Sequence, residues 1–158
     1  MVSDKFSSLC EELGKILKIQ LRAHRGKTML LRFQSGISCY LEQAKGDMLI
    51  VIATIGKPPP IGPYRDNFFR EALKANGLPA PRKGFFAYSV KQESLLLTDH
   101  LSMDDLTGQK LVDFLQPFLQ KAEHWKQALE RNEIPSFLGT EVSFGRGTPA
   151  GGLFGLIR

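Results

Sequence analysis

The chain has 158 residues and a formal net charge of +5, with 42% hydrophobic and 23% charged residues, which is ordinary for one globular domain. Its two cysteines, Cys10 and Cys39, are too few for a disulfide framework, and their spacing matches no metal site. The longest apolar run, from Met48 to Ile55, is far shorter than the roughly 20 residues that cross a bilayer. We therefore expect a soluble, cytoplasmic protein.

An amphipathic helix is predicted over residues 4–18, because apolar residues recur there at intervals of three and four. Gly14 lies inside this helix and would allow another segment to approach closely. The segment from Lys15 to Arg32 contains several basic side chains but no carboxylate. Such a cluster can attract phosphate or an acidic partner, but a solvated helix end and loop is the simpler explanation.

Three strands are predicted next. Residues 28–33 and 37–42 alternate with period two and are joined through a short Gly-containing turn, which is typical of a hairpin. Residues 48–55 form a continuous apolar run, which predicts a strand covered on both faces. A stiff Pro-rich connector follows, and Pro63 is favourable at a helix start.

A second helix is predicted from Tyr64 to Asn76, with Phe68, Phe69 and Leu73 on one stripe. Asn76–Gly77 is the pair that most easily takes a left-handed helix cap.

Two further strands, 85–90 and 95–97, surround a short polar turn. Residues 102–105 then have the form of a capping box, and an apolar stripe carries a long helix to about Arg131. Residues 136–158 contain six glycines and no apolar periodicity, so we expect a disordered tail. Its apolar pieces, such as 153–157, could equally be a docking element or a frayed end.

The predicted order is αβββαββα, in one domain over residues 1–135. Short loops between the strands favour a mostly antiparallel, twisted sheet flanked by three helices, which is an α+β fold.

Catalytic chemistry is poorly supported by the sequence. Asp99–His100 could pair a base with its orienting carboxylate, but no serine or cysteine stands on a Gly-flanked turn as a nucleophile. No histidine has a second ligand at helical spacing, so we predict no metal site and no cofactor. Gly145–Ala150 imitates a dinucleotide fingerprint but follows no strand. The aromatic, nucleophile-poor segment 64–100 favours a protein that binds protein and is not an enzyme.

Over residues 5–133 the chain resembles the class I type III secretion chaperones, the CesT/SycE-like family. The resemblance is carried by the opening helix 6–14, the helix 64–76, the strands 84–88 and 95–101, and the closing helix. In that last helix it uses the apolar positions Leu115, Phe118, Ala122 and Trp125. The finer likeness is to chaperones of secretion gatekeeper proteins.

This resemblance implies a small dimer without ATPase activity, a homodimer or a heterodimer with a related chaperone, that serves virulence. It would hold the N-terminal segment of a secreted effector or gatekeeper protein in extended form. By position, the resemblance places cargo binding on the first helix and first strands, at Leu9, Leu13, Ile16, Leu17, Leu31 and Phe33. It places the dimer interface on the central helix and the next strand, at Phe68, Phe69, Leu73, Phe86 and Tyr88.

Two alternatives stay open at this stage. Each of those apolar residues could simply pack in the core, because a helical stripe does not identify its neighbour. The basic cluster Lys15–Arg32 could instead serve a nucleic-acid-binding regulator. The basic charge is a departure from the family, whose members are usually acidic, and so is the Gly-rich tail.

Overall fold

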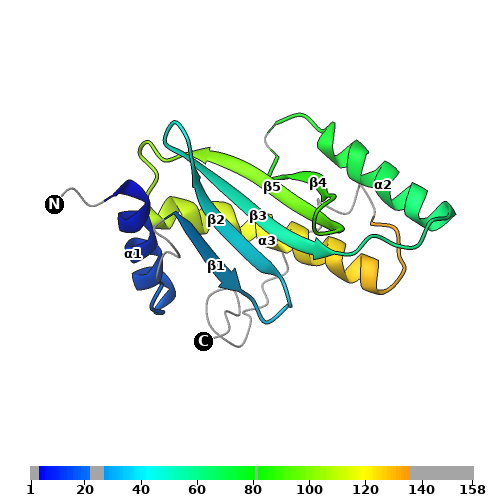
Figure 1. Ribbon diagram of the computed structural model, residues 1–158, viewed down its shortest axis with the longest axis horizontal. Helices are drawn as coiled ribbons and strands as arrows, with labels where there is room; N and C mark the ends of the chain where they lie inside the picture. The colour runs from blue at the N-terminus through cyan, green and yellow to red at the C-terminus, as the bar shows by residue number, and fades with distance from the viewer. Residues whose placement is uncertain (1–3, 22–26, 81, 136–158) are drawn as a thin grey trace.

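The computed structural model describes residues 4–21, 27–80 and 82–135 (Figure 1). The predicted tail, residues 136–158, lies outside them. The described elements are α1 (Lys5–Leu17), β1 (Thr28–Arg32), β2 (Ser38–Ala44), β3 (Met48–Gly56), α2 (Pro63–Asn76), β4 (Phe85–Ser89), β5 (Ser94–Ser102) and α3 (Gly108–Glu130). This order confirms the predicted α+β fold.

The strands form one five-stranded sheet in the order β1-β2-β3-β5-β4, and every neighbouring pair is antiparallel. The most apolar strand, β3, therefore lies at the centre, while β1 and β4 form the edges. The antiparallel prediction is confirmed, and the insertion of β5 between β3 and β4 is new information from the structure.

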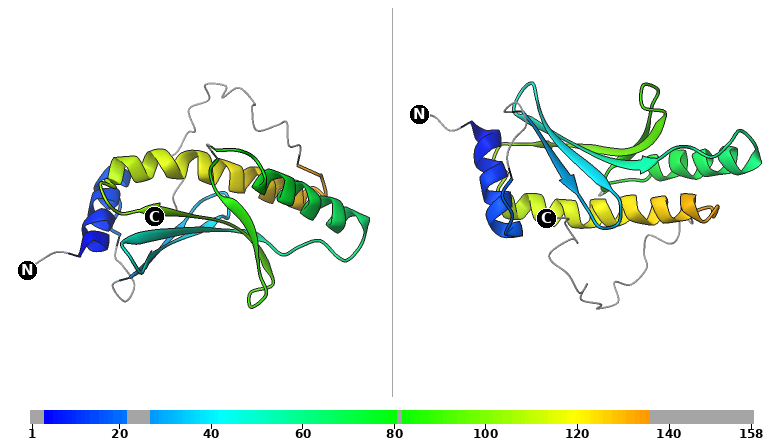
Figure 2. Two further views of the ribbon diagram at one scale, coloured as in Figure 1. Left: turned by 90° about the horizontal axis from the view of Figure 1, so that it is seen from above. Right: turned by 60° about the horizontal axis from the view of Figure 1, so that its bottom comes forward.

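All three helices lie on one side of the sheet (Figures 1 and 2). The long helix α3 runs across the sheet, and α1 and α2 lie at its opposite ends. The core forms where the inward side chains of the strands meet these helices, and it includes Phe6, Leu13, Val51, Phe68, Leu97, Leu111 and Phe118.

Trp125 joins three elements at one end of this core. Its ring lies 5.3 Å from the ring of Phe68 on α2, edge to face, and 4.0 Å from the ring of Phe86 on β4. Aromatic pairs of this kind contribute about 0.5–1.5 kcal/mol beyond the burial of their area. The position of α2 against β4 is therefore fixed through α3.

The start of α3 is held by α1. The Glu12 Oε2 atom accepts a hydrogen bond of 2.7 Å from the Gly108 N–H, and a Cβ on Gly108 would lie 2.7 Å from the Glu12 Cβ. Thr107 is the N-cap, and its hydroxyl accepts from the Lys110 N–H. The predicted capping box at residues 102–105 is wrong, because β5 continues to Ser102 and pairs there with Met48.

Candidate binding surface

One face of the sheet is left without a helix. Along β3 the burial alternates: Leu49, Val51 and Ala53 are fully buried, whereas Met48, Ile50 and Ile52 on the other side are partly exposed. In the described part of the chain nothing packs on that other side (Figure 2). The prediction that β3 is covered on both faces is therefore wrong for the part of the chain that the structure describes.

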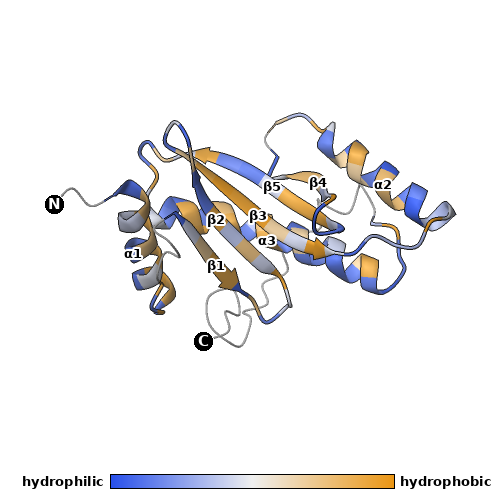
Figure 3. Cartoon of the chain, viewed as in Figure 1, coloured by the Kyte–Doolittle hydropathy of each residue, from blue (hydrophilic) through white to orange (hydrophobic). Residues whose placement is uncertain are grey.

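We call this surface the open face. An apolar row crosses it through successive register partners, from Leu30 to Tyr40, to Ile52, to Thr98 and to Phe85. Figure 3, coloured by the hydropathy of each residue, shows that β3 consists mainly of apolar residues. The open face has seven large apolar side chains: Leu30, Tyr40, Met48, Ile50, Ile52, Phe85 and Leu96. A contiguous exposed apolar surface is typical of a binding site.

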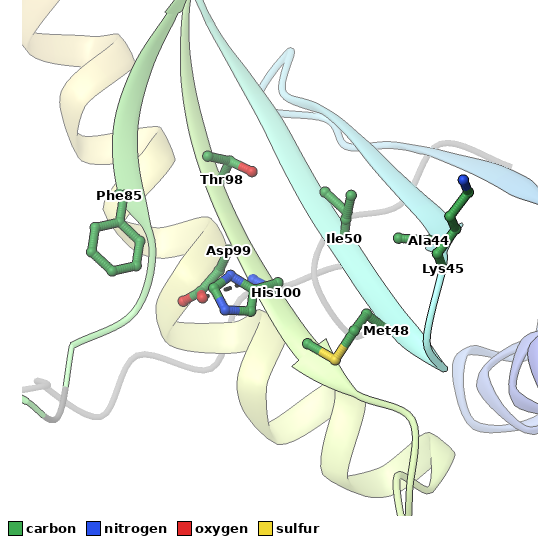
Figure 4. Close-up of a pocket in the computed structure, with 8 residues that line it drawn as sticks. All are labelled: Ala44, Lys45, Met48, Ile50, Phe85, Thr98, Asp99 and His100. Carbon is green, nitrogen blue, oxygen red and sulfur yellow. Dashed lines mark hydrogen bonds between the residues drawn. The ribbon is translucent and has the colours of Figure 1, made fainter.

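A pocket of about 340 Å³ lies on the open face (Figure 4). Its lining combines apolar side chains of β3 and β4 with polar groups of β5 and of the β2–β3 turn: Ala44, Lys45, Met48, Ile50, Phe85, Thr98, Asp99 and His100. The pocket is lined mainly by apolar surface, so it suits a large apolar side chain of a partner.

Asp99 closes the end of the β4–β5 ladder beside this pocket. Its Oδ2 atom accepts a hydrogen bond from the Gly84 N–H and its Oδ1 atom accepts one from the His100 N–H, each at 2.8 Å. The bond between Asp99 and His100 therefore goes to the backbone and does not orient the imidazole ring (Figure 4). The geometry gives this pair a structural role.

The edge of the sheet at β1 can accept another strand. The Phe33 N–H donates to the Ile37 carbonyl and the Lys27 carbonyl accepts from Gln43, so odd-numbered residues of β1 face β2. By the alternation of an antiparallel ladder, the backbone groups of Thr28, Leu30 and Arg32 face outward. In the described residues no strand pairs with them. An extended peptide can therefore add here through main-chain hydrogen bonds.

The opposite edge, at β4, is blocked by a side chain. The Asn76 Oδ1 atom accepts from the Phe86 N–H at 2.7 Å, and its Nδ2 atom donates to the Phe86 carbonyl at 2.9 Å. The predicted left-handed cap at Asn76–Gly77 is wrong, because Gly77 has φ −80° and ψ −4°. The structure uses Asn76 to protect an exposed edge, which is a known way to prevent unwanted strand pairing.

A groove of about 500 Å³ runs beside the end of α1 and includes Lys15, Lys18 and Leu21 in its lining. A Cβ on Gly14 would lie 2.9 Å from the Ile19 carbonyl oxygen, and the Ile19 N–H donates to the Gly14 carbonyl. The predicted close approach at Gly14 is confirmed. Two of the basic residues of Lys15–Arg32 thus line a groove, while residues 22–26 lie outside the described part.

The predicted cargo residues separate into two groups. Leu9, Leu13, Leu31 and Phe33 are buried in the core of the described chain, at most 5% exposed. They are not on its surface, because the apolar stripe of α1 faces α3 and the inward side of β1 faces the helices. Ile16 and Leu17 are only partly buried and can still contact a partner.

The predicted dimer residues divide in the same way. Phe68 and Phe86 pack around Trp125 and are buried, so they are core residues. Leu73 is 70% exposed, Tyr88 is 43% exposed and Phe69 is partly buried. Only these last three offer apolar surface to a second subunit.

Burial raises the pKa of the Cys10 thiol to about 11 and that of the Cys39 thiol to about 12. Both thiols are therefore protonated at neutral pH. Among the described residues no group of His, Cys, Asp or Glu side chains could hold a metal ion. In that same part of the chain, none of the helices has the length and apolar character of a membrane span.

Comparisons with known proteins agree with this geometry. The profile of the Tir chaperone protein (CesT) family matches residues 8–126. A structure described as the HopA1–SchA chaperone–effector complex is similar with a TM-score of 0.64 and 14% identity, covering 78% of this chain and 94% of that chain. The Yersinia pestis type III secretion chaperone SycH, solved with a fragment of YscM2, is similar with a TM-score of 0.59 and 21% identity, covering 74% and 96%.

A third structure, the ExoT–SpcS complex from Pseudomonas aeruginosa, has a TM-score of 0.59 and 13% identity, covering 77% of this chain and 97% of that chain. At these identities the three structures show a shared fold. A sequence search of curated proteins gives no match.

Proposed function

The chain belongs to the Tir chaperone protein (CesT) family, and we propose that it is a class I type III secretion chaperone for a secreted effector or gatekeeper protein. In this proposal it binds the N-terminal segment of that cargo in an extended form and keeps it competent for export. The family is one of chaperones, and we assign the chain no catalytic activity and no cofactor.

The observation that carries this proposal is the open face. A row of apolar side chains crosses the whole sheet on the side that no described helix covers, from Leu30 on β1 to Phe85 on β4. An unfolded cargo segment can bury these side chains, at roughly 25 cal/mol for each Å² of apolar surface removed from water. Its backbone can also pair with the outward groups of β1.

An extended cargo fits this surface better than a folded one. A strand added at β1 continues the sheet and adds alternate side chains to the open face beside Leu30, since side chains of a strand point to opposite faces in turn. The partly exposed Ile16 and Leu17 of α1 would offer further apolar contacts. Cargo contact thus moves from the buried positions Leu9, Leu13, Leu31 and Phe33 to the open face and the end of α1.

For the dimer, we propose that the outer surface of α2 meets a second subunit. Leu73 and Tyr88 are exposed apolar side chains at the end of the molecule formed by α2 and β4, and Phe69 is partly exposed beside them. Because the Asn76 side chain occupies both backbone groups of Phe86, the edge of β4 favours side-chain packing with a second subunit over strand pairing. The partner subunit can be a second copy or a related chaperone, and the protein would act in the bacterial cytoplasm.

The nucleic-acid-binding alternative gains no support from the family match or from the similar structures, which are chaperones.

A matched pair of variants tests the proposal. Ile52→Asp places a charge in the middle of the open face, and Ile61→Asp places the same charge on a side chain that is 91% exposed, outside this face. We expect Ile52→Asp to lose co-purification with the N-terminal segment of the cargo, and Ile61→Asp to keep it. Melting curves of both variants establish that they fold. A folded Ile52→Asp variant that retains cargo would refute the proposal.

A further inference from the structure

Three cationic side chains gather where the loop before β4 meets α3, each placed over an aromatic ring. The guanidinium carbon of Arg82 lies 4.2 Å from the ring centroid of Phe85. The Lys83 ammonium lies 5.1 Å from the ring of Phe114, and the Lys121 ammonium lies 4.9 Å from the ring of Phe86. We call Arg82, Lys83 and Lys121 the cation cluster.

The cation cluster has no carboxylate partner among the described residues. The salt bridges found there involve Lys5, Lys74 and Lys126. Lys121 instead donates to the carbonyls of Lys83 and Gly84, at 3.1 and 3.2 Å. The Lys121 ammonium is therefore held at the start of β4 by neutral carbonyl oxygens.

The surroundings of Lys121 lower the pKa of its ammonium group. Burial, and in addition the positive charge of Arg82, lower the pKa of the Lys121 ammonium, while Asp99 raises it. Asp99, which also accepts the backbone N–H groups of Gly84 and His100, offsets the repulsion from Arg82, so burial is what leaves the pKa of Lys121 lowered. An external anion at the cluster would stabilise the charged form of Lys121 and would meet cations that form no salt bridge among the described residues.

Arg82 connects the cation cluster to the apolar pocket of the open face. Arg82 stacks on Phe85, and Phe85 lines the pocket together with Ile50 and Met48 (Figure 4). A peptide with an apolar residue in the pocket would place a neighbouring carboxylate near Arg82. From this juxtaposition, and resting on the proposed function, we infer that the cation cluster binds an acidic stretch of the cargo beside an apolar residue that fills the pocket.

A peptide fits this site better than a nucleic acid does. Single-stranded nucleic acids bind by stacking bases on aromatic rings. The rings of Phe85, Phe86 and Phe114 each carry a cation over one face, and Phe86 and Phe114 are buried. Arg82 beside the apolar pocket, with Lys83 and Lys121 on the neighbouring part of the molecule, instead matches a segment that alternates acidic and apolar residues.

Two synthetic peptides test the inference on the full-length protein: acetyl-(Glu-Leu)₃ and its neutral counterpart acetyl-(Gln-Leu)₃. We expect only the acidic peptide to bind, to shift the amide resonance of Gly84 and to raise the pKa of Lys121, measured by NMR of the labelled lysine. Binding should weaken severalfold when salt rises from about 50 to about 200 mM, because exposed charges are then screened.

Charge reversal locates the binding. Lys83→Glu and Arg82→Glu should each weaken binding of the acidic peptide by at least about tenfold. Lys91→Glu is the matched control, since Lys91 is an exposed lysine in the β4–β5 turn with no salt bridge among the described residues. Equal binding of the two peptides, equal effects of Lys83→Glu and Lys91→Glu, or tighter binding of an oligothymidylate at the same residues would each overturn the inference.

Failure of this inference is distinguishable from failure of the proposed function. Full cargo retention by Lys83→Glu, together with loss of cargo from Ile52→Asp, overturns the role of the cation cluster and leaves the chaperone function intact. A wild-type chain that retains no secreted protein overturns the proposed function, whatever the peptides do.

Discussion

Two side chains, Asn76 and Asp99, form hydrogen bonds with backbone groups at the outer edge and at the start of β4. Asn76 satisfies both backbone groups of Phe86 at the outer edge of β4. Asp99 accepts hydrogen bonds from the N–H of Gly84, just before β4, and from the N–H of His100 on β5. These polar contacts leave β1 as the edge that is open to an added strand in the described sheet.

Replacing Asn76 should therefore destabilise the chain and expose an edge. Asn76→Ala leaves the N–H and the carbonyl of Phe86 without their partner, which we expect to cost about 1–3 kcal/mol in the free energy of unfolding. Urea denaturation measures this loss. The control is Asn67→Ala, an exposed asparagine on the same helix that accepts from Arg70, with an expected change within about 0.5 kcal/mol. Equal costs for both variants would show that Asn76 does not plug the edge.

The buried thiols give a second prediction at this scale. Since burial raises the pKa of Cys10 to about 11 and of Cys39 to about 12, the reactive thiolate is scarce at pH 8. We expect a thiol reagent such as DTNB to modify native protein slowly and to modify urea-unfolded protein within the mixing time. Raising the pH toward 11 should accelerate modification of Cys10 before that of Cys39. Rapid modification of both thiols at pH 8 in the native state would contradict their burial.

Hydrogen bonds between a side chain and a distant backbone group could not be predicted from the sequence, because they join residues that are far apart along the chain. Glu12 caps the Gly108 amide across 96 positions, whereas the local pattern pointed to residues 102–105. The periodicity of α1 correctly identified its apolar stripe but not what the stripe contacts. Leu9 and Leu13 therefore proved to be core residues, while Ile16 and Leu17 remained partly accessible.

At the scale of elements, the sequence predicts most of the fold. Each helix and strand has its own local signal, so their order and approximate bounds were confirmed. The strand β5 runs from Ser94 to Ser102 and is longer than the predicted strand 95–97. The prediction stopped early because the second half of β5 contains the polar residues Asp99 and His100. Asp99 lies at the end of the β4–β5 ladder, where its carboxylate accepts the backbone N–H groups of Gly84 and His100.

The exposed side of α2 carries the prediction about association. Leu73→Asp places a charge on a side chain that is 70% exposed in the single chain, so it should leave the fold intact and break the proposed dimer. Phe69 is partly buried, so Phe69→Asp would mix effects on folding and on association. Light scattering on Leu73→Asp should give the mass of a monomer.

The same substitution at Leu30, on the opposite edge of the sheet, is the control. Leu30 is 37% exposed on β1, so Leu30→Asp should remain a dimer and weaken cargo binding instead. A dimeric Leu73→Asp variant with unchanged melting would move the dimer interface away from α2.

At the scale of the whole molecule, the arrangement is asymmetric. Three helices seal one side of the sheet, and the described residues leave the other side open (Figure 2). The continuous apolar run of β3 predicted cover on both faces, and the described residues cover one of them. Under the proposed function this pattern reflects burial against a partner, and a rule based on a single chain cannot distinguish that from burial in the chain's own core.

Photocross-linking from the centre of the open face tests this account most directly. p-Benzoylphenylalanine in place of Ile52 should cross-link, in the native host, to the N-terminal segment of a secreted protein. The same probe in place of Ile61 should not. Deleting that N-terminal segment should remove the cross-link. Cross-links from position 52 that fall only within the chain itself, for example on residues 136–158, would show that the open face is covered internally and would contradict the account.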